Sequence, residues 1–302
     1  MRRPLRSAII VLLVRSTLNP QPGSVVKHAL RSFAIIASLG PLGPLVAPNA
    51  SAQAPAATVT LTRLDCGTNA APSDVARFSD TYAYNGLKVQ LAISCYLIRH
   101  GDDYMVWDTG NPVGTAPNAP KTPLVDLLAQ LKLTSDQVKF VGISHYHGDH
   151  TGQVSSFPKA TLLIGKGDWD ILSNPAPAAG VNATNFASWI SGGGKVEPLP
   201  GDKDVFGDGS VIVLNTPGHT PGHHSVLVRL KETGTVLITG DLAHFHENYD
   251  SNGVPTFNTN RSETLASLDR FKKIATNLKA TVIIQHDARD IGKLPAFPAA
   301  AR

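Results

Sequence analysis

The stretch SHYHGDHTG, residues 144–152, places His145, His147, Asp149 and His150 within six positions. The chain has only 11 histidines, so three of them in one short loop favour a metal site over a set of turn-capping residues. Imidazole and carboxylate groups without thiolate are ligands that suit Zn²⁺ and, as alternatives, Fe²⁺, Mn²⁺ or Co²⁺. This loop therefore predicts a metal centre.

The spacing within the loop predicts that its side chains reach two different metal ions. In an extended H-x-H segment the alternation of side chains puts His145 and His147 on the same side. Gly148 is expected to let the chain turn, so that Asp149 and His150 can reach a second ion.

Three further candidate ligands follow predicted strands. His219 comes after strand 210–216, Asp241 after strand 235–240 and His286 after strand 281–285. Strand ends on one rim of a sheet are where α/β proteins build their sites. We therefore expect His145, His147 and His219 to hold one ion, Asp149, His150 and His286 to hold a second, and Asp241 to bridge them.

This ligand set leaves positions for water. It forms no closed four-ligand structural site, and two nearby ions would hold a hydroxide that is nucleophilic at neutral pH. The predicted cofactors are two divalent metal ions, with Zn²⁺ preferred, and the predicted chemistry is hydrolysis.

The rest of the sequence predicts β-rich hairpins followed by units of one strand and one helix, and then the same order again. Two half-domains that face each other, with helices outside a sheet-on-sheet core, would satisfy this order. Predicted strands cover 57–66, 88–100, 138–144, 160–165, 210–216, 224–230, 235–241 and 280–286, with a hairpin turn across 100–102 and helices at 123–133 and 260–278, the second capped by Asn260.

The charge of the chain is unevenly distributed. Residues 1–52 contain six basic and no acidic residues, so subtraction from the totals of 27 and 23 leaves 21 basic and 23 acidic groups in residues 53–302. No basic patch suggests a nucleic-acid partner. A small-molecule substrate is the expected partner, and the sequence does not indicate an oligomeric state.

Residues 1–52 are interpreted as a leader with a cleavable signal peptide. A basic start, an apolar centre and the A-x-A end at Ala50–Ala52 predict cleavage after Ala52 and a periplasmic or secreted protein with a single catalytic domain at 53–302. We further hypothesise that residues 1–24 are not translated. An uncleaved membrane anchor is the alternative, but Gly and Pro interrupt the short apolar run, so no stable anchor is expected.

The two cysteines, Cys66 and Cys95, lie in predicted strands. An exported protein could pair them in a disulfide, and they could equally be small buried hydrophobic residues. Neither is placed like a zinc ligand or a nucleophile.

The segments SHYHGDH, TPGH, TGD and QH, preceded by WDTG at 107–110, resemble the metallo-β-lactamase-fold hydrolase superfamily over most of residues 57–298. The resemblance implies a four-layer αββα sandwich, of α/β (α+β) class, with a dinuclear site at its edge. It also implies that Asp108 supports the site without binding metal.

A narrower resemblance concerns LDCG (64–67), SCYLIRHG (94–101) and the segments 240–271 and 283–298, which look like proteins grouped with N-acyl-homoserine lactonases. It implies opening of a lactone ring (quorum quenching) by attack of a metal-bridging hydroxide, with Asp149 as a ligand that also handles a proton. Asp241 counts against a true β-lactamase, which lacks this carboxylate. Aryl-ester, phosphotriester or β-lactam hydrolysis on the same site, and a periplasmic zinc-binding module without catalysis, are the alternatives.

His244 departs from the lactonase pattern, which has a tyrosine at this position. An imidazole N–H could donate the same hydrogen bond to the substrate carbonyl, and a supporting or surface role is the alternative. His223, His224 and His246 are interpreted as structural or solvent-facing. Segment 174–193, with Phe186, Trp189 and Ile190, could form an apolar flap, although a surface helix packed on the core is preferred.

Overall fold

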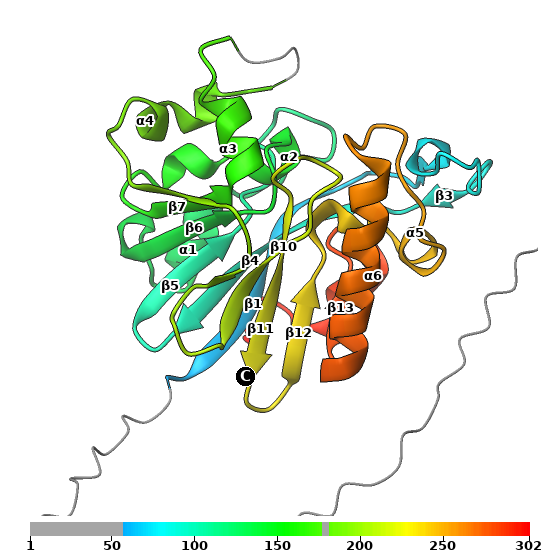
Figure 1. The fold of residues 1–302 in the computed structure, drawn as a ribbon. Coiled ribbons are helices and arrows are strands. Elements are labelled where there is room, and N and C mark those ends of the chain that lie inside the picture. Colours follow the sequence, from blue (N-terminus) through cyan, green and yellow to red (C-terminus); the bar gives the residue numbers. More distant parts are fainter. Residues whose placement is uncertain (1–56, 177–180) are drawn as a thin grey trace, which may run out of the picture. The chain divides into compact units, whose positions relative to one another are not determined.

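Two β-sheets lie face to face, with helices on their outer sides (Figure 1). The computed structural model describes residues 57–176 and 181–302. The predicted leader, residues 1–52, lies outside the described residues. The described residues belong to one unit.

The first sheet has six strands in the order β1-β4-β5-β6-β7-β8. The β1, β4 and β5 pairs are antiparallel, and β5 to β8 run parallel. The strands are β1 (Val59–Thr68), β4 (Ala92–His100), β5 (Asp103–Trp107), β6 (Val138–Ile143), β7 (Thr161–Gly165) and β8 (Val196–Leu199).

The second sheet has five strands in the order β13-β12-β11-β10-β9, in which only the β12–β13 pair is parallel. A separate two-stranded ribbon pairs β2 (Ser73–Asp74) with β3 (Lys88–Val89). The strands of the second sheet are β9 (Lys203–Asp204), β10 (Val211–Asn215), β11 (His224–Leu230), β12 (Gly234–Ile238) and β13 (Thr281–Ile283).

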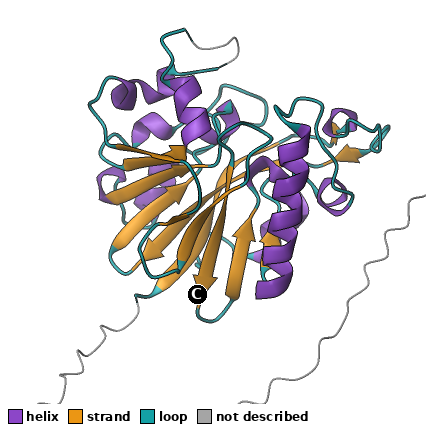
Figure 2. Ribbon diagram, in the orientation of Figure 1, coloured by secondary structure: helices purple, strands orange, loops and turns teal. Residues whose placement is uncertain are grey.

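The helices gather on the outer sides of the sheets and at the loop-rich end of the molecule (Figure 2). The α-helices are α1 (Leu124–Gln130), α2 (Gly148–Thr151), α3 (Lys166–Leu172), α4 (Ala187–Ile190), α5 (His246–Asp250) and α6 (Arg261–Leu278). Short 3₁₀ turns are η1 (Ala76–Phe78), η2 (Ser135–Gln137), η3 (Val154–Ser156), η4 (Thr184–Phe186), η5 (Gly240–Leu242) and η6 (Ala288–Lys293).

Successive side chains of each strand point to opposite faces of the sheet, and this alternation produces the layers. On β11, Val226 and Val228 pack into the core between the sheets, whereas Leu227 packs with α6 residues such as Phe271. On β4, Ile98 faces the inner core, whereas Cys95 and Leu97 face the outer core with α1. Side chains on both faces of each sheet are therefore buried, and the predicted four-layer αββα sandwich is confirmed.

Local signals in the sequence account for several element ends. The side chain of Asn260 accepts hydrogen bonds from the backbone N–H groups of Ser262 and Glu263 at 3.0 and 3.1 Å, so it caps α6 as predicted. The predicted hairpin joins β4 to β5, because His100 pairs with Asp103. Strand 88–100 is wrong as one strand, because Lys88–Val89 pairs with β2 and the strand of the large sheet starts only at Ala92.

Cys66 and Cys95 form a disulfide that joins β1 to β4, with 5.8 Å between their Cα atoms. The regular register stops at Asp65↔Ser94 and resumes at Thr68↔Ala92. Three steps on β1 thus correspond to two on β4, which is a β-bulge. The disulfide resolves the alternatives left by the sequence.

The stretch 174–193 packs on the outer core of the first sheet. Phe186 and Trp189 are 0% and 2% exposed within this core, and Ile190 is exposed. The preferred interpretation as a surface helix is therefore confirmed for the described part of this stretch, while residues 177–180 lie outside it. Within the described residues, no helix is long and apolar enough to cross a membrane.

Candidate metal centre

All seven predicted ligands meet where strands of both sheets end. β6 leads into His145 and His147, and the next turn, α2, carries Asp149 and His150. The loops after β10, β12 and β13 carry the other three, His219, Asp241 and His286.

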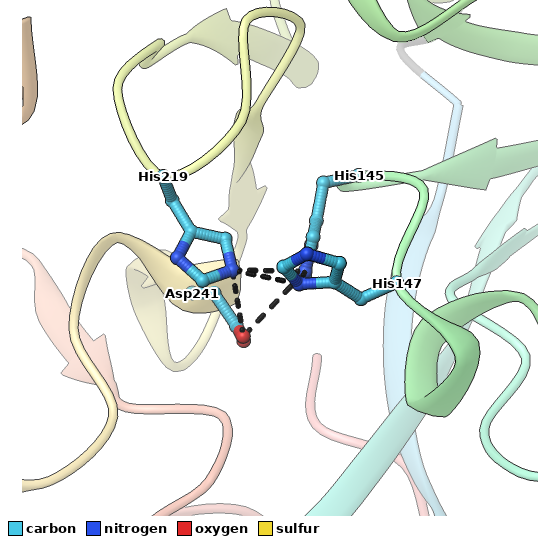
Figure 3. A group of neighbouring side chains, drawn as sticks. All are labelled: His145, His147, His219 and Asp241. Atoms are coloured by element: carbon cyan, nitrogen blue, oxygen red, sulfur yellow. Dashed lines mark hydrogen bonds and ion pairs between the residues drawn. The ribbon is translucent and has the colours of Figure 1, made fainter. Parts of the chain in front are cut away.

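The first group contains His145, His147, His219 and Asp241, whose side chains point toward one another (Figure 3). His145 Nε2 lies 2.9 Å from His147 Nδ1, and His219 Nε2 lies 3.2 and 3.0 Å from these two atoms. Asp241 Oδ2 lies 3.5 Å from His145 Nε2 and 3.3 Å from His219 Nε2. The short His145–His147 distance agrees with the H-x-H prediction.

The second group contains Asp149, His150 and His286. His150 Nε2 and His286 Nε2 are 3.0 Å apart, and Asp149 Oδ2 lies 3.9 and 3.7 Å from them. Asp241 Oδ1 approaches the same two nitrogens at 3.0 and 2.9 Å. Each oxygen of Asp241 therefore faces one group, which is the arrangement that a bridging carboxylate requires.

Hydrogen bonds on the outer nitrogens set the tautomers. His286 Nδ1 lies 2.7 Å from the carbonyl oxygen of Ala92, and His219 Nδ1 lies 2.8 Å from Asn258 Oδ1. A carbonyl oxygen can only accept, so Nδ1 carries a proton and Nε2, which points into the site, is the nitrogen that can bind a metal. Metal-binding histidines typically have such an outer partner.

The protonation of the two groups differs. Burial, together with neighbouring imidazoles, lowers the pKa of His145 well below its ordinary value and that of His147 to about 4. At His150, burial opposes protonation, but the Asp241 and Asp108 carboxylates raise the pKa well above its ordinary value. His145 and His147 are therefore already neutral and open to metal, whereas an ion must displace a proton at His150.

One buried atom shows that the donors fit a metal. Asp241 Oδ1 has no hydrogen-bond partner among the described residues, because its close contacts with His150 and His286 lack hydrogen-bond geometry. A buried carboxylate oxygen without a partner is costly. Here the lone pairs of imidazoles and carboxylates converge with no hydrogen-bond donor between them. A divalent cation at this point would satisfy them.

Asp108 supports the second group from outside both ligand groups, as the family resemblance implied. Its Oδ2 accepts from His150 Nδ1 at 2.8 Å and from Gln285 Nε2 at 2.7 Å, and its Oδ1 accepts from the Ser144 backbone N–H at 2.7 Å. The residue is 1% exposed and has a φ of 56°. Sequence reasoning missed Gln285, although it directly precedes His286.

Asp168 is a second supporting carboxylate, which the sequence did not suggest. It is fully buried and accepts from the Tyr146 backbone N–H at 3.1 Å, the Thr220 hydroxyl at 2.8 Å and the Gly222 backbone N–H at 2.7 Å. It thereby ties the loop of His145 and His147 to the loop of His219. Nothing in its local sequence, Gly167-Asp168-Trp169, indicates this role.

His244 is buried at the edge of the centre, so a surface role is wrong. Its Nε2 lies 3.1 Å from Asp241 Oδ2 and donates to it, because a carboxylate oxygen only accepts. Phe78 packs edge-on against its ring, with 4.7 Å between centroids. Its Nδ1 has no hydrogen-bond partner among the described residues.

The other histidines are structural, as interpreted. His223 and His224 are fully buried, and His246 pairs with Asp290 at 2.6 Å. The chain turns at Gly148, as predicted, because this glycine begins the helical turn α2, and the turn uses no positive φ at Gly148. The helical turn itself carries Asp149 and His150 away from His147.

A cavity of about 420 Å³ opens onto both groups of ligands. This volume suits a small-molecule substrate. Beyond the ligands its walls combine the polar residues Asn69 and Asn118 with apolar Phe78, Leu91, Ile93 and Phe257. Arg77 also lines it, with its guanidinium 4.5 Å from the centre of the Phe257 ring. None of the described residues of segment 174–193 lines this cavity.

The sequence profile of the Metallo-beta-lactamase superfamily matches residues 89–286. The N-acyl homoserine lactonase AttM of Rhizobium johnstonii is 30% identical over 234 residues, which are 67% of this chain and 84% of that protein.

Two solved structures show the same fold. A quorum-quenching N-acyl homoserine lactone lactonase superposes with a TM-score of 0.69 at 23% identity, over 81% of this chain and 99% of that one. AidC, a dizinc quorum-quenching lactonase in complex with its product N-hexanoyl-L-homoserine, superposes with a TM-score of 0.61 at 17% identity, over 82% and 90% of the two chains.

Proposed function

Because the chain belongs to the metallo-beta-lactamase superfamily, we propose that it is a metal-dependent hydrolase that opens lactone rings, with N-acyl-homoserine lactones as substrates. The observation that carries this proposal is the convergence of seven imidazole and carboxylate side chains in two groups at the end of one cavity. The related AttM enzyme acts on this substrate class.

Two divalent ions, Zn²⁺ in both positions, are proposed as the cofactors. His145, His147 and His219 would hold one ion, Asp149, His150 and His286 the other, and Asp241 would contribute one oxygen to each. AidC, which has the same fold, is a dizinc protein. When bound, such a pair supplies a nucleophilic hydroxide at neutral pH and polarises the substrate carbonyl.

The protein groups around the ions have separate roles in this proposal. His244 holds its Nε2–H on Asp241 Oδ2 at the edge of the cavity, and turning this N–H from Asp241 to the substrate carbonyl oxygen would stabilise the negative charge that develops there. Asp149, whose side chain is 35% exposed, can take and release a proton at the cavity. The buried supports, Asp108 and Asp168, hold the histidine loops in place and exchange no proton with substrate.

The cavity walls fit an acylated lactone. The lactone ring would lie against the ligands, and the acyl chain would lie between Phe78, Phe257 and Leu91. Burial of apolar chain surface against these rings supplies affinity, about 25 cal/mol for each Å² removed from water. The polar lactone ring would thus contact the ligands, and the apolar acyl chain would contact apolar side chains.

Proton release tests the proposal, because ring opening produces an acid. The mature zinc-loaded protein is given a long-chain N-acyl-homoserine lactone, and a pH indicator records the rate. We expect fast release that a chelator abolishes and that Asp149→Ala lowers by orders of magnitude, whereas Asp170→Ala, at an exposed carboxylate paired with Lys166, leaves the rate unchanged.

The alternatives predict other results. A zinc-binding module without catalysis would lose some metal affinity in Asp149→Ala and would show no turnover in the parent chain. Absence of lactone opening by a protein that carries two ions would refute the lactonase proposal, and aryl esters, phosphotriesters and β-lactams would then be assayed.

Export to the periplasm or beyond the cell is also proposed. The Cys66–Cys95 disulfide supports it, because disulfides persist in oxidising compartments. Cell fractionation and N-terminal sequencing of the mature chain test it, with Gln53 expected as the first residue. A mature protein in the cytoplasm that begins before residue 53 would contradict it.

A further inference from the structure

We propose that the Cys66–Cys95 disulfide is a positioning element for the second ligand group, so that binding of the second metal ion depends on disulfide formation. The inference rests on the dinuclear centre proposed above. It goes beyond that centre by assigning a role to two residues that bind no metal and contact no substrate.

The first step is the contact between the disulfide and the turn after β5. Gly110 packs so closely on Cys66 that a Cβ at Gly110 would lie 2.7 Å from Cys66 Cβ and 2.9 Å from Cys66 Sγ. Gly110 also has a φ of 64°, so only glycine suits this position. The turn Asp108–Gly110 therefore packs directly against the disulfide.

The second step runs from this turn to His150. The Thr109 backbone N–H and hydroxyl both donate to the carbonyl oxygen of His150, at 2.7 and 3.0 Å. Asp108 accepts from the ring of His150 at 2.8 Å, and the Gly152 N–H donates to the Gly110 carbonyl oxygen at 2.7 Å. The turn thus holds both the backbone and the ring of one ligand.

The third step runs along β4, the other strand of the disulfide. The Ala92 N–H donates to the His286 carbonyl oxygen at 2.9 Å, and the Ala92 carbonyl oxygen accepts from His286 Nδ1 at 2.7 Å. Ser94, next to Cys95, accepts from Gln285 Nε2 at 2.8 Å, and the same amide donates to Asp108. The other strand thus holds the second imidazole of the group.

The first ligand group is held differently. His219 is oriented by Asn258, and its loop is tied to that of His145 by Asp168. None of these contacts involves β1 or the bulge, and the Asp108–Gly110 turn reaches the first group through Ser144, whose N–H donates to Asp108 Oδ1 at 2.7 Å next to His145. Loss of the disulfide should therefore act more strongly on His150 and His286, which the disulfide-linked strands and turn hold directly, than on the first group.

The test compares zinc binding by the wild-type chain and by Cys66→Ala/Cys95→Ala. Zinc per chain is counted by mass spectrometry after dialysis, and affinities are measured by competition with a chromophoric chelator. We expect the variant to keep one ion and to bind the second about 10- to 100-fold more weakly, as when partners of metal ligands are removed. Circular dichroism verifies the fold.

Two further variants test whether the loss of zinc is specific to the second ligand group. Leu268→Ala removes buried contacts of α6 on the far side of the second sheet, and it should lower stability while keeping two ions. In an Asp149→Ala chain, the cysteine substitutions should remove no additional zinc, because both changes act on the same group.

If the double variant does not fold, Gly110→Ala takes its place, because it keeps the disulfide and displaces the turn from Cys66. Two ions bound at wild-type affinity, or equal loss of both ions, would overturn the inference. The metal count decides it independently of substrate. Two zinc ions without lactone opening would refute the proposed function and not this role of the disulfide.

Discussion

His223 Nε2 accepts the backbone N–H of Asp241 at a distance of 2.9 Å. Nδ1 of the same ring donates to the Thr216 carbonyl oxygen at 2.9 Å, which leaves the Nε2 lone pair free to accept. Burial, and then the nearby His219, hold the pKa of His223 well below its ordinary value, so the ring stays neutral. A histidine outside both ligand groups therefore fixes the backbone of the residue shared by both.

Replacement of this acceptor should weaken metal binding. In His223→Ala the N–H of Asp241 becomes a buried donor without a partner, and the zinc affinity is expected to fall about 10- to 100-fold. His223→Gln, which can still present an acceptor oxygen, should keep most of the affinity. Competition with a chromophoric chelator measures the change, and His100→Ala, which removes a histidine bonded to Asp208, is the control. Unchanged affinity in His223→Ala would contradict the prediction.

Substitution of His244 should affect turnover more than binding. His244→Phe keeps the packing on Phe78 and removes the N–H, so kcat for lactone opening is expected to fall about 100-fold, with a small change in KM, as when a donor to a developing oxyanion is lost. His244→Tyr restores an O–H donor and should recover much of kcat. The initial rates of both variants check this. A kcat for His244→Phe equal to that of the wild type would show that the ring only supports Asp241.

Asp168 should give the metal-free chain a distinctive pH dependence. Burial, only partly offset by its three hydrogen bonds, raises its pKa to about 6 from an ordinary value of 3.8. Between about pH 4 and pH 6 the folded chain therefore holds a proton that the unfolded chain releases. The free energy of unfolding should fall as the pH rises through this window, by at most about 3 kcal/mol, and this contribution should be constant above it.

Urea unfolding of the wild-type chain and of Asp168→Asn, both in excess chelator, isolates this effect. The difference in unfolding free energy between the two chains should change from pH 4 to pH 6 and level off by pH 7. A difference that does not vary with pH would mean that the Asp168 carboxyl titrates near its ordinary value in the folded chain.

The sequence predicted the grouping of the seven candidate ligands, because ligand chemistry is local. Histidines and aspartates immediately after strands lie at one rim whatever the details of packing, so His219, Asp241 and His286 could be assigned to the same site as His145. Strand periodicity likewise predicted the layers. These signals depend on residue type and spacing, which the sequence contains.

The supports of the centre could not be predicted, because they depend on tertiary packing. Asp168 accepts from donors 22, 52 and 54 residues away, and nothing nearby in the sequence marks it. The disulfide was undecidable because a bulge changes the register between Asp65 and Thr68. His244 could not be placed without the aromatic side chains around it. The turn predicted at Gly148 is present, but the sequence did not show that it is helical.

Because both ligand groups share the Asp241 carboxylate, metal binding at one group is thermodynamically coupled to metal binding at the other. Oδ1 contacts His150 and His286, and Oδ2 contacts His145 and His219. An ion bound on one side must change the affinity of the other, and by the reciprocity of linked equilibria the effect is the same in both directions. A metal titration of this protein should therefore deviate from two independent isotherms, and the deviation measures the coupling that a single side chain provides.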